Sequence, residues 1–580
     1  MLSRVRHCPR TASSATTPQS WFPASPTLAL LSIGYLSTRV PQTFIELAVG
    51  SGDIATAGSA ARRYTTAVIE GVPCAPLSVL DTERNLAAVR ALFGFRVREF
   101  LADETSCHFC SFRSSLDATS LRAAVSCWNH AFLEDVVNAL RESAVLDEAV
   151  SRAFGLGEEE SRFVDTEVGL HPTSYTGSAV AGELMRLYHL PEEELMAEAV
   201  GHWGAKRWFT KKSYFVDRRV EIVCHYLQVP PQLILDSLLG HTVALELAPR
   251  CQSVLSEPLG CAFGRWDIRY ATGERQPPGL PAPFAPLPVC PPGTLQNSDG
   301  LPARPDDVPA GYPIDIPWDG ILVDDPGHPR DIEARVRRVL EVIWQVRAGA
   351  IEQEACEILG VRSLRDYFAK PARFFADHLQ RYSKSRRKAP IYWPLSTPSG
   401  SYTLWIYYHR LTDQTLYTCV NNFVEPKLQQ IADSAVQLRQ KADRIIRDEK
   451  DLERLTDLEL ELREFRDELL RLAPIWKPNL NDGVQITAAP LWRLFQHRPW
   501  KKILKETWQQ LEKGDYDWAH LAYSLWPDRV RDKCRTDKSL AIAHDLEALY
   551  VEPPPSAKKK RGRRPAETGS DEAQDADDTV

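Results

Sequence analysis

The sequence lacks any apolar stretch near the roughly 20 residues that a membrane-spanning helix needs. The longest apolar run near the start, at 28–36, is interrupted by Ser32 and Gly34. It also lacks a Walker phosphate-binding loop and a Gly-x-Ser-x-Gly nucleophile elbow, so ATP hydrolysis and that type of serine hydrolysis have no support. A large excess of one charge is missing as well, since the net charge is −7 over 580 residues. This balance excludes a wholly basic nucleic-acid coat protein but allows a local basic groove. We expect no membrane partner.

Clustered cysteines are also missing, because the 12 cysteines are spread along the chain. This distribution is typical of reduced thiols and predicts a cytoplasmic protein. The exception is Cys107-His108-Phe109-Cys110, which would need two more ligands to close a zinc site. Cys127 and His130 are candidates by sequence distance, but no second pair has the usual spacing. A buried thiol without a metal is the favoured interpretation, and we expect no metal site.

Hydrophobic periodicity predicts mostly helices. Apolar residues recur at helical spacing over 121–152, and 331–359 has the pattern of a helix pair. Segment 402–408 alternates and is rich in aromatics, which predicts a strand. Leucines and other apolar residues repeat at three and four over 428–445 and 455–472, with the charged segment 447–451 between them. This predicts an antiparallel helical hairpin or an interrupted coiled coil, and an ordinary amphipathic helix pair is equally compatible.

The sequence therefore predicts a predominantly helical α+β fold with several domains. A Pro-rich stretch at 277–317 cannot be helix or central strand, so we expect a linker or an ordered irregular wrap that divides the chain near its middle. The expected segments are a disordered or mis-started tail (1–45), a remnant α/β segment (46–124), a helical domain (125–250), an irregular Pro-rich linking region (251–330), an α/β domain with a small aromatic-rich sheet (331–424), the hairpin or coiled coil (425–473), a C-terminal helical domain (474–550) and a disordered basic-then-acidic tail (551–580).

One glycine-rich stretch invites a cofactor hypothesis. Residues 46–53 read as a short apolar strand followed by Gly50-Ser51-Gly52, and Glu70 stands twenty residues after Gly50. An acid at that distance holds a ribose in some nucleotide-binding folds. A chance Gly-rich turn is the favoured interpretation of so short a motif, and we assign no cofactor-binding, catalytic or metal residue.

The most informative pattern is a basic cluster among aromatics. The cluster has five cations within eight residues and no acid between them, and Tyr392 and Trp393 follow it. Crowded like charges repel unless a counter-charge arrives, so phosphate contact is favoured over a solvated charge run. For the aromatics after Tyr402 a core position is favoured. Further basic stretches at 206–219 and 498–505, and an AT-hook-like Arg-Gly-Arg in the tail, strengthen the expectation of a polyanion partner. The expected DNA-binding residues are Arg381, Lys384, Arg386, Arg387, Lys388, Tyr392, Trp393, Arg561 and Arg563.

Several collinear motifs resemble a known family. These are 381–393 (RYSKSRRKAPIYW), 263–267 (FGRWD), 320–325 (GILVDD), 407–410 (YYHR), 478–484 (PNLNDGV), 514–519 (GDYDWA) and 526–530 (WPDRV). Over roughly 125–550 the chain resembles the C-terminal half of large adenine-specific DNA methyltransferases of phage-defence systems, of the BREX PglX and DISARM types, and related fused restriction-methylases.

The resemblance implies double-stranded DNA as a partner, with segment 331–424 in target recognition. In the family the N-terminal half holds the S-adenosylmethionine fold and the loop that grips the flipped adenine. No Asn-Pro-Pro-Tyr-type motif occurs in this chain, so its own catalysis is in doubt. We expect a recognition part that works with a catalytic methylase half or other defence-complex subunits. The alternatives are an active methyltransferase with degenerate motifs, and a scaffold subunit that does not bind DNA.

Overall fold

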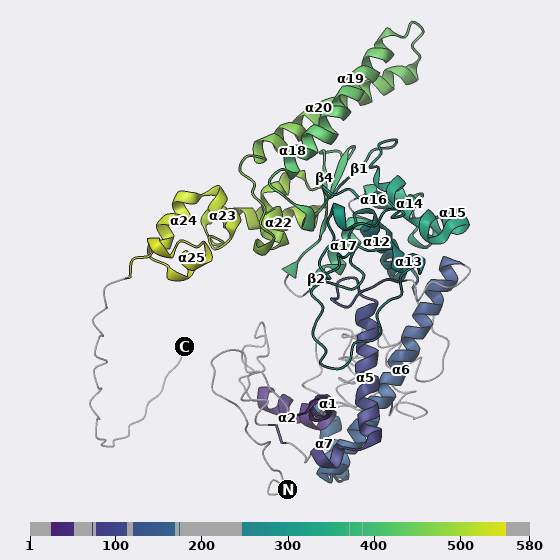
Figure 1. Cartoon of the computed structure of the whole chain (residues 1–580), viewed down its shortest axis with the longest axis vertical. Coiled ribbons are helices and arrows are strands. Elements are labelled where there is room, and N and C mark those ends of the chain that lie inside the picture. The colour runs from purple at the N-terminus through teal and green to yellow at the C-terminus, as the bar shows by residue number, and fades with distance from the viewer. Residues whose placement is uncertain are drawn as a thin grey trace, which may run out of the picture.

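The computed structural model describes residues 25–50, 72–73, 77–112, 120–168, 173, 246–370, 372–384 and 387–552. Within these ranges the protein is predominantly helical with a small antiparallel sheet, which confirms the predicted fold class (Figure 1). No helix in this part of the chain has the length and apolar character needed to cross a bilayer.

The N-terminal region is built from helices. They are α1 (Pro26–Leu36), α2 (Arg39–Gly50), α4 (Leu77–Leu80), α5 (Glu83–Leu101), α6 (Leu121–Phe154) and α7 (Glu158–Val168). Helix α6 begins where the Ser120 side chain accepts a hydrogen bond from the Ala123 amide, and it covers the segment predicted from periodicity. Helix α5 runs beside it and is held by a bidentate ion pair from Arg98 to Asp135 at 2.8 Å. The pair extends from the main body toward the small cluster of α1, α2 and α7 (Figure 1).

The sheet has three antiparallel strands in the order β1-β5-β4. They are β1 (Ile321–Asp324), β4 (Tyr392–Ser396) and β5 (Thr403–Tyr407), so the strand predicted at 402–408 is confirmed. Leu404 pairs with Val323 on one side and with Leu395 on the other. Strands β4 and β5 are buried along their whole length, because helices cover the sheet and the strand sequences are apolar and aromatic.

The helices around the sheet come from both sides of the Pro-rich segment. They are α12 (Ala248–Ala262), α13 (Ile268–Thr272), α14 (Ile332–Trp344), α15 (Ala348–Leu359), α16 (Leu364–Ala369) and α17 (Phe374–Arg381). The helix pair predicted over 331–359 is thus confirmed as α14 and α15. One hydrophobic core contains Phe109 and Val125 together with Leu255, Trp405 and Leu521. The Pro-rich segment therefore does not separate two cores.

The Pro-rich segment is an ordered irregular wrap, one of the two forms that its sequence predicts. Its only helical turn is η5 (Pro305–Asp307) within the fully described range 277–317. The Gly293 amide donates to the Phe109 carbonyl at 3.0 Å, and Ile314 and Ile316 are buried. The segment therefore packs back onto the chain that precedes it.

A helical hairpin projects from the body, formed by α19 (Glu425–Gln440) and α20 (Ile446–Leu472) (Figure 1). The hairpin form of the prediction is confirmed, but the break lies at 441–445 rather than at 447–451. Asp448 explains the shift, because its carboxylate accepts from the Ile445 amide at 3.0 Å and pairs with Lys441 at 2.6 Å. These contacts let the charged segment begin α20.

The C-terminal region is a chain of short helices around one longer one. They are α21 (Val484–Ala488), α22 (Arg498–Lys513), α23 (His520–Leu525), α24 (Pro527–Cys534) and α25 (Lys538–Ala543). Helix α18 (Thr415–Cys419) precedes the hairpin in the chain. A π-helical turn covers Val420–Val424, and 3-10 turns cover Gln345–Arg347, Tyr408–Arg410, Leu480–Asp482, Ala489–Leu494 and Glu547–Leu549.

Two N-terminal predictions are wrong. Residues 46–50, expected as a short strand before a Gly-rich loop, form the last turn of helix α2. In the tail expected over 1–45, residues 26–36 and 39–45 are helical, in α1 and α2, so this part is folded and the expectation of disorder is wrong there. Gly52, Glu70, the basic stretch at 206–219, residues 1–24 and the tail from 553 onward, with Arg561 and Arg563, lie outside the described residues.

Candidate nucleic-acid interface

The basic cluster forms a small β-hairpin directly after α17. Strand β2 (Ser383–Lys384) pairs antiparallel with β3 (Arg387–Lys388), so that Lys384 lies opposite Arg387 and Ser383 opposite Lys388. The Ala389 amide donates to the Tyr382 carbonyl at 3.1 Å and closes the base of this hairpin. Arg386 lies between the strands, outside the described residues. The strand labelled β2 in Figure 1 marks its position beside α17.

Arg381 is set apart from the other cations of the cluster by a buried partner, which corrects the sequence prediction. Its guanidinium pairs with Glu104 at 2.7 Å, and the Glu104 side chain is 1% exposed. Ser256 donates to the same carboxylate at 2.8 Å. A buried ion pair of this kind leaves no free charge for a phosphate, so Arg381 anchors the base of the hairpin.

Arg265 completes the anchor from a third part of the chain. Its guanidinium donates to the Tyr382 hydroxyl and, at 3.1 Å, to the Glu104 carbonyl. It also lies 3.9 Å from the centre of the Trp266 ring. Glu104 thus holds Arg381 at the end of α17, and Arg265 holds Tyr382, the next residue. Together these contacts fix the turn from α17 into β2.

Tyr392 and Trp393 are fully buried in β4, so they do not offer aromatic faces to a base, which also corrects the prediction. His378 orders the chain before them, since its Nε2 accepts from the amides of Ile391 at 2.9 Å and Tyr392 at 3.2 Å. Burial lowers the pKa of His378 well below its usual range, which keeps the ring neutral as this acceptor role requires. The indole of Trp393 donates to the Pro390 carbonyl at 2.8 Å. These residues fix the exit of the hairpin.

A second basic stretch occupies the first turns of α22. Arg498, Lys502 and Lys505 are exposed there, and the Lys505 ammonium lies 5.3 Å from the ring centre of Trp492. Trp500 is buried. The Phe375 ring of α17 packs edge-on against His497, with ring centres 5.4 Å apart, and His497 caps α22. Helix α17 therefore links this stretch to the β2–β3 hairpin.

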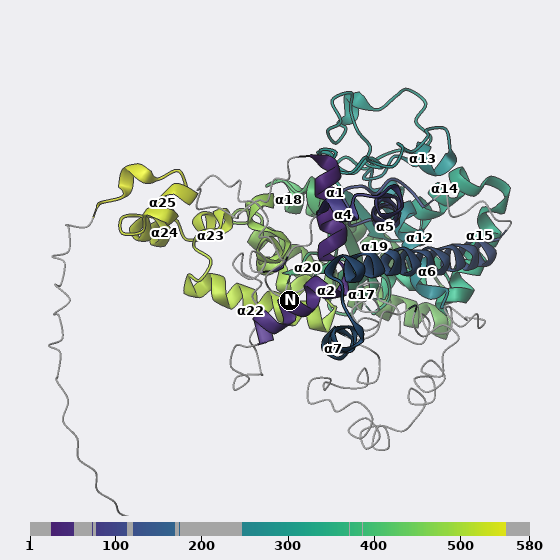
Figure 2. The same ribbon diagram turned by 90° about the horizontal axis from the view of Figure 1, so that it is seen from below.

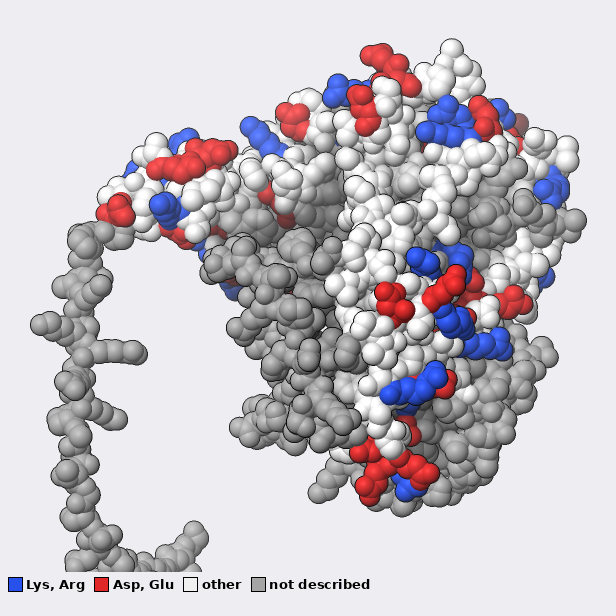
Figure 3. All heavy atoms as spheres, turned by 60° about the horizontal axis from the view of Figure 1, so that its bottom comes forward, with Lys and Arg blue, Asp and Glu red and all other residues white. Residues whose placement is uncertain are grey.

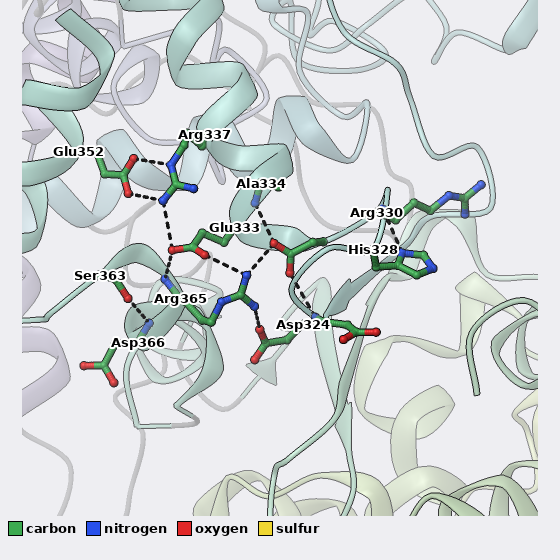
Figure 4. Close-up of polar contacts among 12 residues, drawn as sticks. Asp324, His328, Arg330, Glu333, Ala334, Arg337, Glu352, Ser363, Arg365 and Asp366 are labelled. Atoms are coloured by element: carbon green, nitrogen blue, oxygen red, sulfur yellow. Dashed lines mark hydrogen bonds and ion pairs between the residues drawn. The ribbon is translucent and has the colours of Figure 1, made fainter. Parts of the chain in front are cut away.

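The sequence did not point to a network of ion pairs beyond the end of β1 (Figure 4). Arg365 lies between the carboxylates of Asp324, Asp331 and Glu333, with 2.7 Å to Asp331 and 2.9 Å to Glu333. Asp331 also accepts from the Ala334 amide at 3.1 Å and so caps α14. Each of these carboxylates has a cationic partner, so the network is suited to fixing β1, α14 and α16 rather than to proton transfer. Only the cap at Asp331 had a sequence signal, an Asp directly before an apolar helix.

The described residues offer no metal centre. No group of three or more His, Cys, Asp or Glu side chains within them is arranged to hold a metal ion. Cys110 is buried while Cys107 and Cys127 are exposed. Burial raises the pKa of the Cys110 thiol to about 12, so this group is protonated at neutral pH.

Charge on the α5–α6 side of the molecule is mixed. Figure 3 shows Lys and Arg side chains interspersed with Asp and Glu over that face. The described part of this face thus offers no broad patch of positive charge. In the described residues, cations gather locally instead, along the β2–β3 hairpin and at the start of α22.

The chain matches no protein-family model, and no curated protein is significantly similar to it. The functional argument therefore rests on the residues themselves. The sequence does not predict the roles of Glu104 and Arg365. A single acid in a loop or a single arginine in a helix has no sequence pattern that indicates which distant residue it pairs with.

Proposed function

We propose that the protein is the DNA-recognition part of an adenine-specific DNA methylation system in the cytoplasm. One observation carries the proposal, namely that the basic cluster is a two-stranded hairpin on a rigid base. Lys384 is paired with Arg387 across its strands, and Lys388 is paired with Ser383 in the same ladder. Like charges directly opposite one another destabilise a β-ladder, and phosphates between them would remove that cost.

The two-stranded form of the hairpin is compatible with a duplex. The DNA major groove admits a two-stranded β-ribbon, and cations on the ribbon can contact the phosphates that border the groove. The base of the hairpin is held by the Arg381–Glu104 pair and by His378, so little ordering entropy remains to be lost on binding. Affinity from such an element is electrostatic and falls steeply with salt.

The methylation context comes from the motif resemblance over 125–550. The family supplies S-adenosylmethionine and the catalytic loop from its other half, and we propose that a catalytic methylase subunit does so here. The described residues do not fit a cofactor loop of their own, because residues 46–50 end a helix instead of a strand. We therefore derive no methyl-transfer step for this chain. The free cysteines throughout the described residues support a reducing compartment.

The test is duplex binding by fluorescence anisotropy at about 50 mM and about 200 mM salt, a range over which phosphate contacts lose much of their affinity. Replacing both Arg386 and Arg387 by Ala should weaken binding and lower the slope of log K against log salt by about 2, one unit for each lost phosphate contact. The control R439A/R444A removes the same charge from exposed positions on the α19–α20 hairpin and should change neither quantity.

Two results would count against the proposal. Unchanged affinity and slope in R386A/R387A would remove the hairpin from the interface. Absence of wild-type binding even at low salt would favour the scaffold alternative, in which the chain joins a defence complex without touching DNA.

A further inference from the structure

An uncharged loop stands out from the body within the Pro-rich wrap. No Lys, Arg, His, Asp or Glu occurs between Arg275 and Asp299. The large apolar side chains in the first part of this loop are exposed: Leu280 by 54%, Phe284 by 54%, Leu287 by 72% and Val289 by 82%. Figure 2 shows the loop as the teal chain beyond α13. Large apolar side chains exposed together in one loop typically mark an interaction site.

The ends of the loop are pinned to one residue. Arg275 pairs with the Asp267 carboxylate at 3.3 Å, and the Asp267 amide donates to the Gly293 carbonyl at 2.8 Å. Between these anchors, one backbone hydrogen bond is made inside 276–289, from the Ala285 amide to the Ala282 carbonyl at 3.0 Å. The two ends of the loop are therefore anchored, while the side chains between them remain exposed.

Its proline spacing sets the backbone. After the turn at Pro283 and Phe284, prolines follow at Pro286, Pro288 and Pro291, and the last two are three residues apart. Such PxxP spacing favours the polyproline II conformation, which has no internal hydrogen bonds and is already ordered before binding. Phe284 lies in the turn before this run, where the Ala285 amide donates to the Ala282 carbonyl, and its φ of +66° is strained for an aromatic residue. An exposed, strained aromatic residue is costly unless a partner covers it.

The chemistry of the loop selects the kind of partner. A nucleic acid or an anionic membrane would need cations, which this loop lacks. Edge pairing with a strand of a second copy would need amide donors, which Pro283, Pro286 and Pro288 do not have. The mode that remains is a groove lined by aromatic side chains, into which a polyproline II ligand inserts its prolines and apolar residues.

We infer that segment 285–289, which follows the turn, is a docking ligand for a protein domain with an aromatic-lined polyproline groove. Leu287 and Val289 supply the apolar contacts, and Pro286 and Pro288 supply the ridges that fit between aromatic rings. Binding depends on shape and apolar area, so it is nearly independent of salt. This property separates it from DNA binding, and either interaction can fail without the other.

The experiment uses the full chain and a panel of purified SH3, WW and EVH1 domains, which represent the known polyproline grooves. Biolayer interferometry with the immobilised chain should detect binding of at least one class, with little change between about 50 mM and about 500 mM salt because no charge pairs form. The variants L287A/V289A and P286A/P288A should each weaken that binding at least about tenfold.

A matched control replaces exposed apolar residues elsewhere, Ile445 and Ile446 at the hairpin turn, which are 59% and 76% exposed. The I445A/I446A variant should bind as the wild type does, and unchanged melting temperatures in all variants would exclude unfolding as the cause. Absence of binding across the panel, or equal binding by the loop variants, would overturn the inference. Self-association in sedimentation velocity that disappears in L287A/V289A would identify a second copy as the occupant and would also overturn it.

Discussion

Glu257 is a fully buried carboxyl group that faces amides and another acid. Its side chain accepts from the Phe112 amide at 3.1 Å, and it lies close enough to Glu104 to feel that charge. Burial raises the pKa of Glu257 to about 7. The unfolded chain has a pKa near 4.3, so between about 4.3 and 7 the folded protein holds a proton that the unfolded chain releases.

Stability should therefore fall as pH rises through that window and level off above pH 7, by about 4 kcal/mol in total. The E257Q variant cannot ionise and should lose less stability between pH 5 and pH 8 than the wild type. Thermal unfolding at the two pH values measures the difference. The exposed Glu512 provides the control, since E512Q should follow the wild type. A wild-type curve that E257Q reproduces would contradict the assignment.

At this scale the sequence predicted types of residue better than their positions. The cations at 381–388 were recognised as a cluster, yet Arg381 points inward because Glu104, 277 residues away in sequence, neutralises it. The aromatics after Tyr402 were expected in the core and are there, whereas Tyr392 and Trp393 were expected near DNA and are equally buried. Burial of these two follows from strand pairing with β5, which only the folded chain brings about.

Among the elements, the Pro-rich wrap depends on one close contact. A Cβ atom on Gly293 would lie 2.0 Å from the backbone oxygen of Cys110, so any side chain there must push the two segments apart. Such overpacking typically costs about 1–3 kcal/mol. The variant G293A should lower the melting temperature and speed proteolysis within 276–289. Its control, G279A, adds the same methyl group where no atom lies within 4 Å and should behave as the wild type.

Element types were predictable wherever the hydrophobic period was long and regular. Helices α6, α14, α15, α19 and α20 and strand β5 all follow such patterns. The turn of the α19–α20 hairpin was displaced because Asp448 caps α20, and local capping outweighed the charge run. The last turn of α2 is helical where the sequence suggests a strand, because a run as short as Leu47, Ala48 and Val49 fits either period.

At the scale of the whole molecule, the shared core predicts that the two halves of the chain stay together when the wrap is cut. Leu255 and Phe263 before the wrap pack in the same cluster as Trp405 and Leu469 after it. A recognition site for a specific protease, inserted between Phe284 and Ala285, should be cut readily because the loop is exposed. The two fragments should still co-elute in native size-exclusion chromatography, since cutting the loop removes no core contact. Separation into independent fragments would show two domains and contradict the shared core.

Helix α6 joins this core to the small N-terminal cluster. Its first turns pack Leu121 and Val125 into the main core, while Val150 near its other end packs against Tyr35 and Val40. A helix of 34 residues is about 51 Å long. Because it is stiff and braced by α5, it acts as a lever arm, and a tilt of about 5° at the core would move the far end by about 4 Å. A partner that binds α1 and α2 would therefore be able to change the orientation of this cluster relative to the main core, which carries the β2–β3 hairpin.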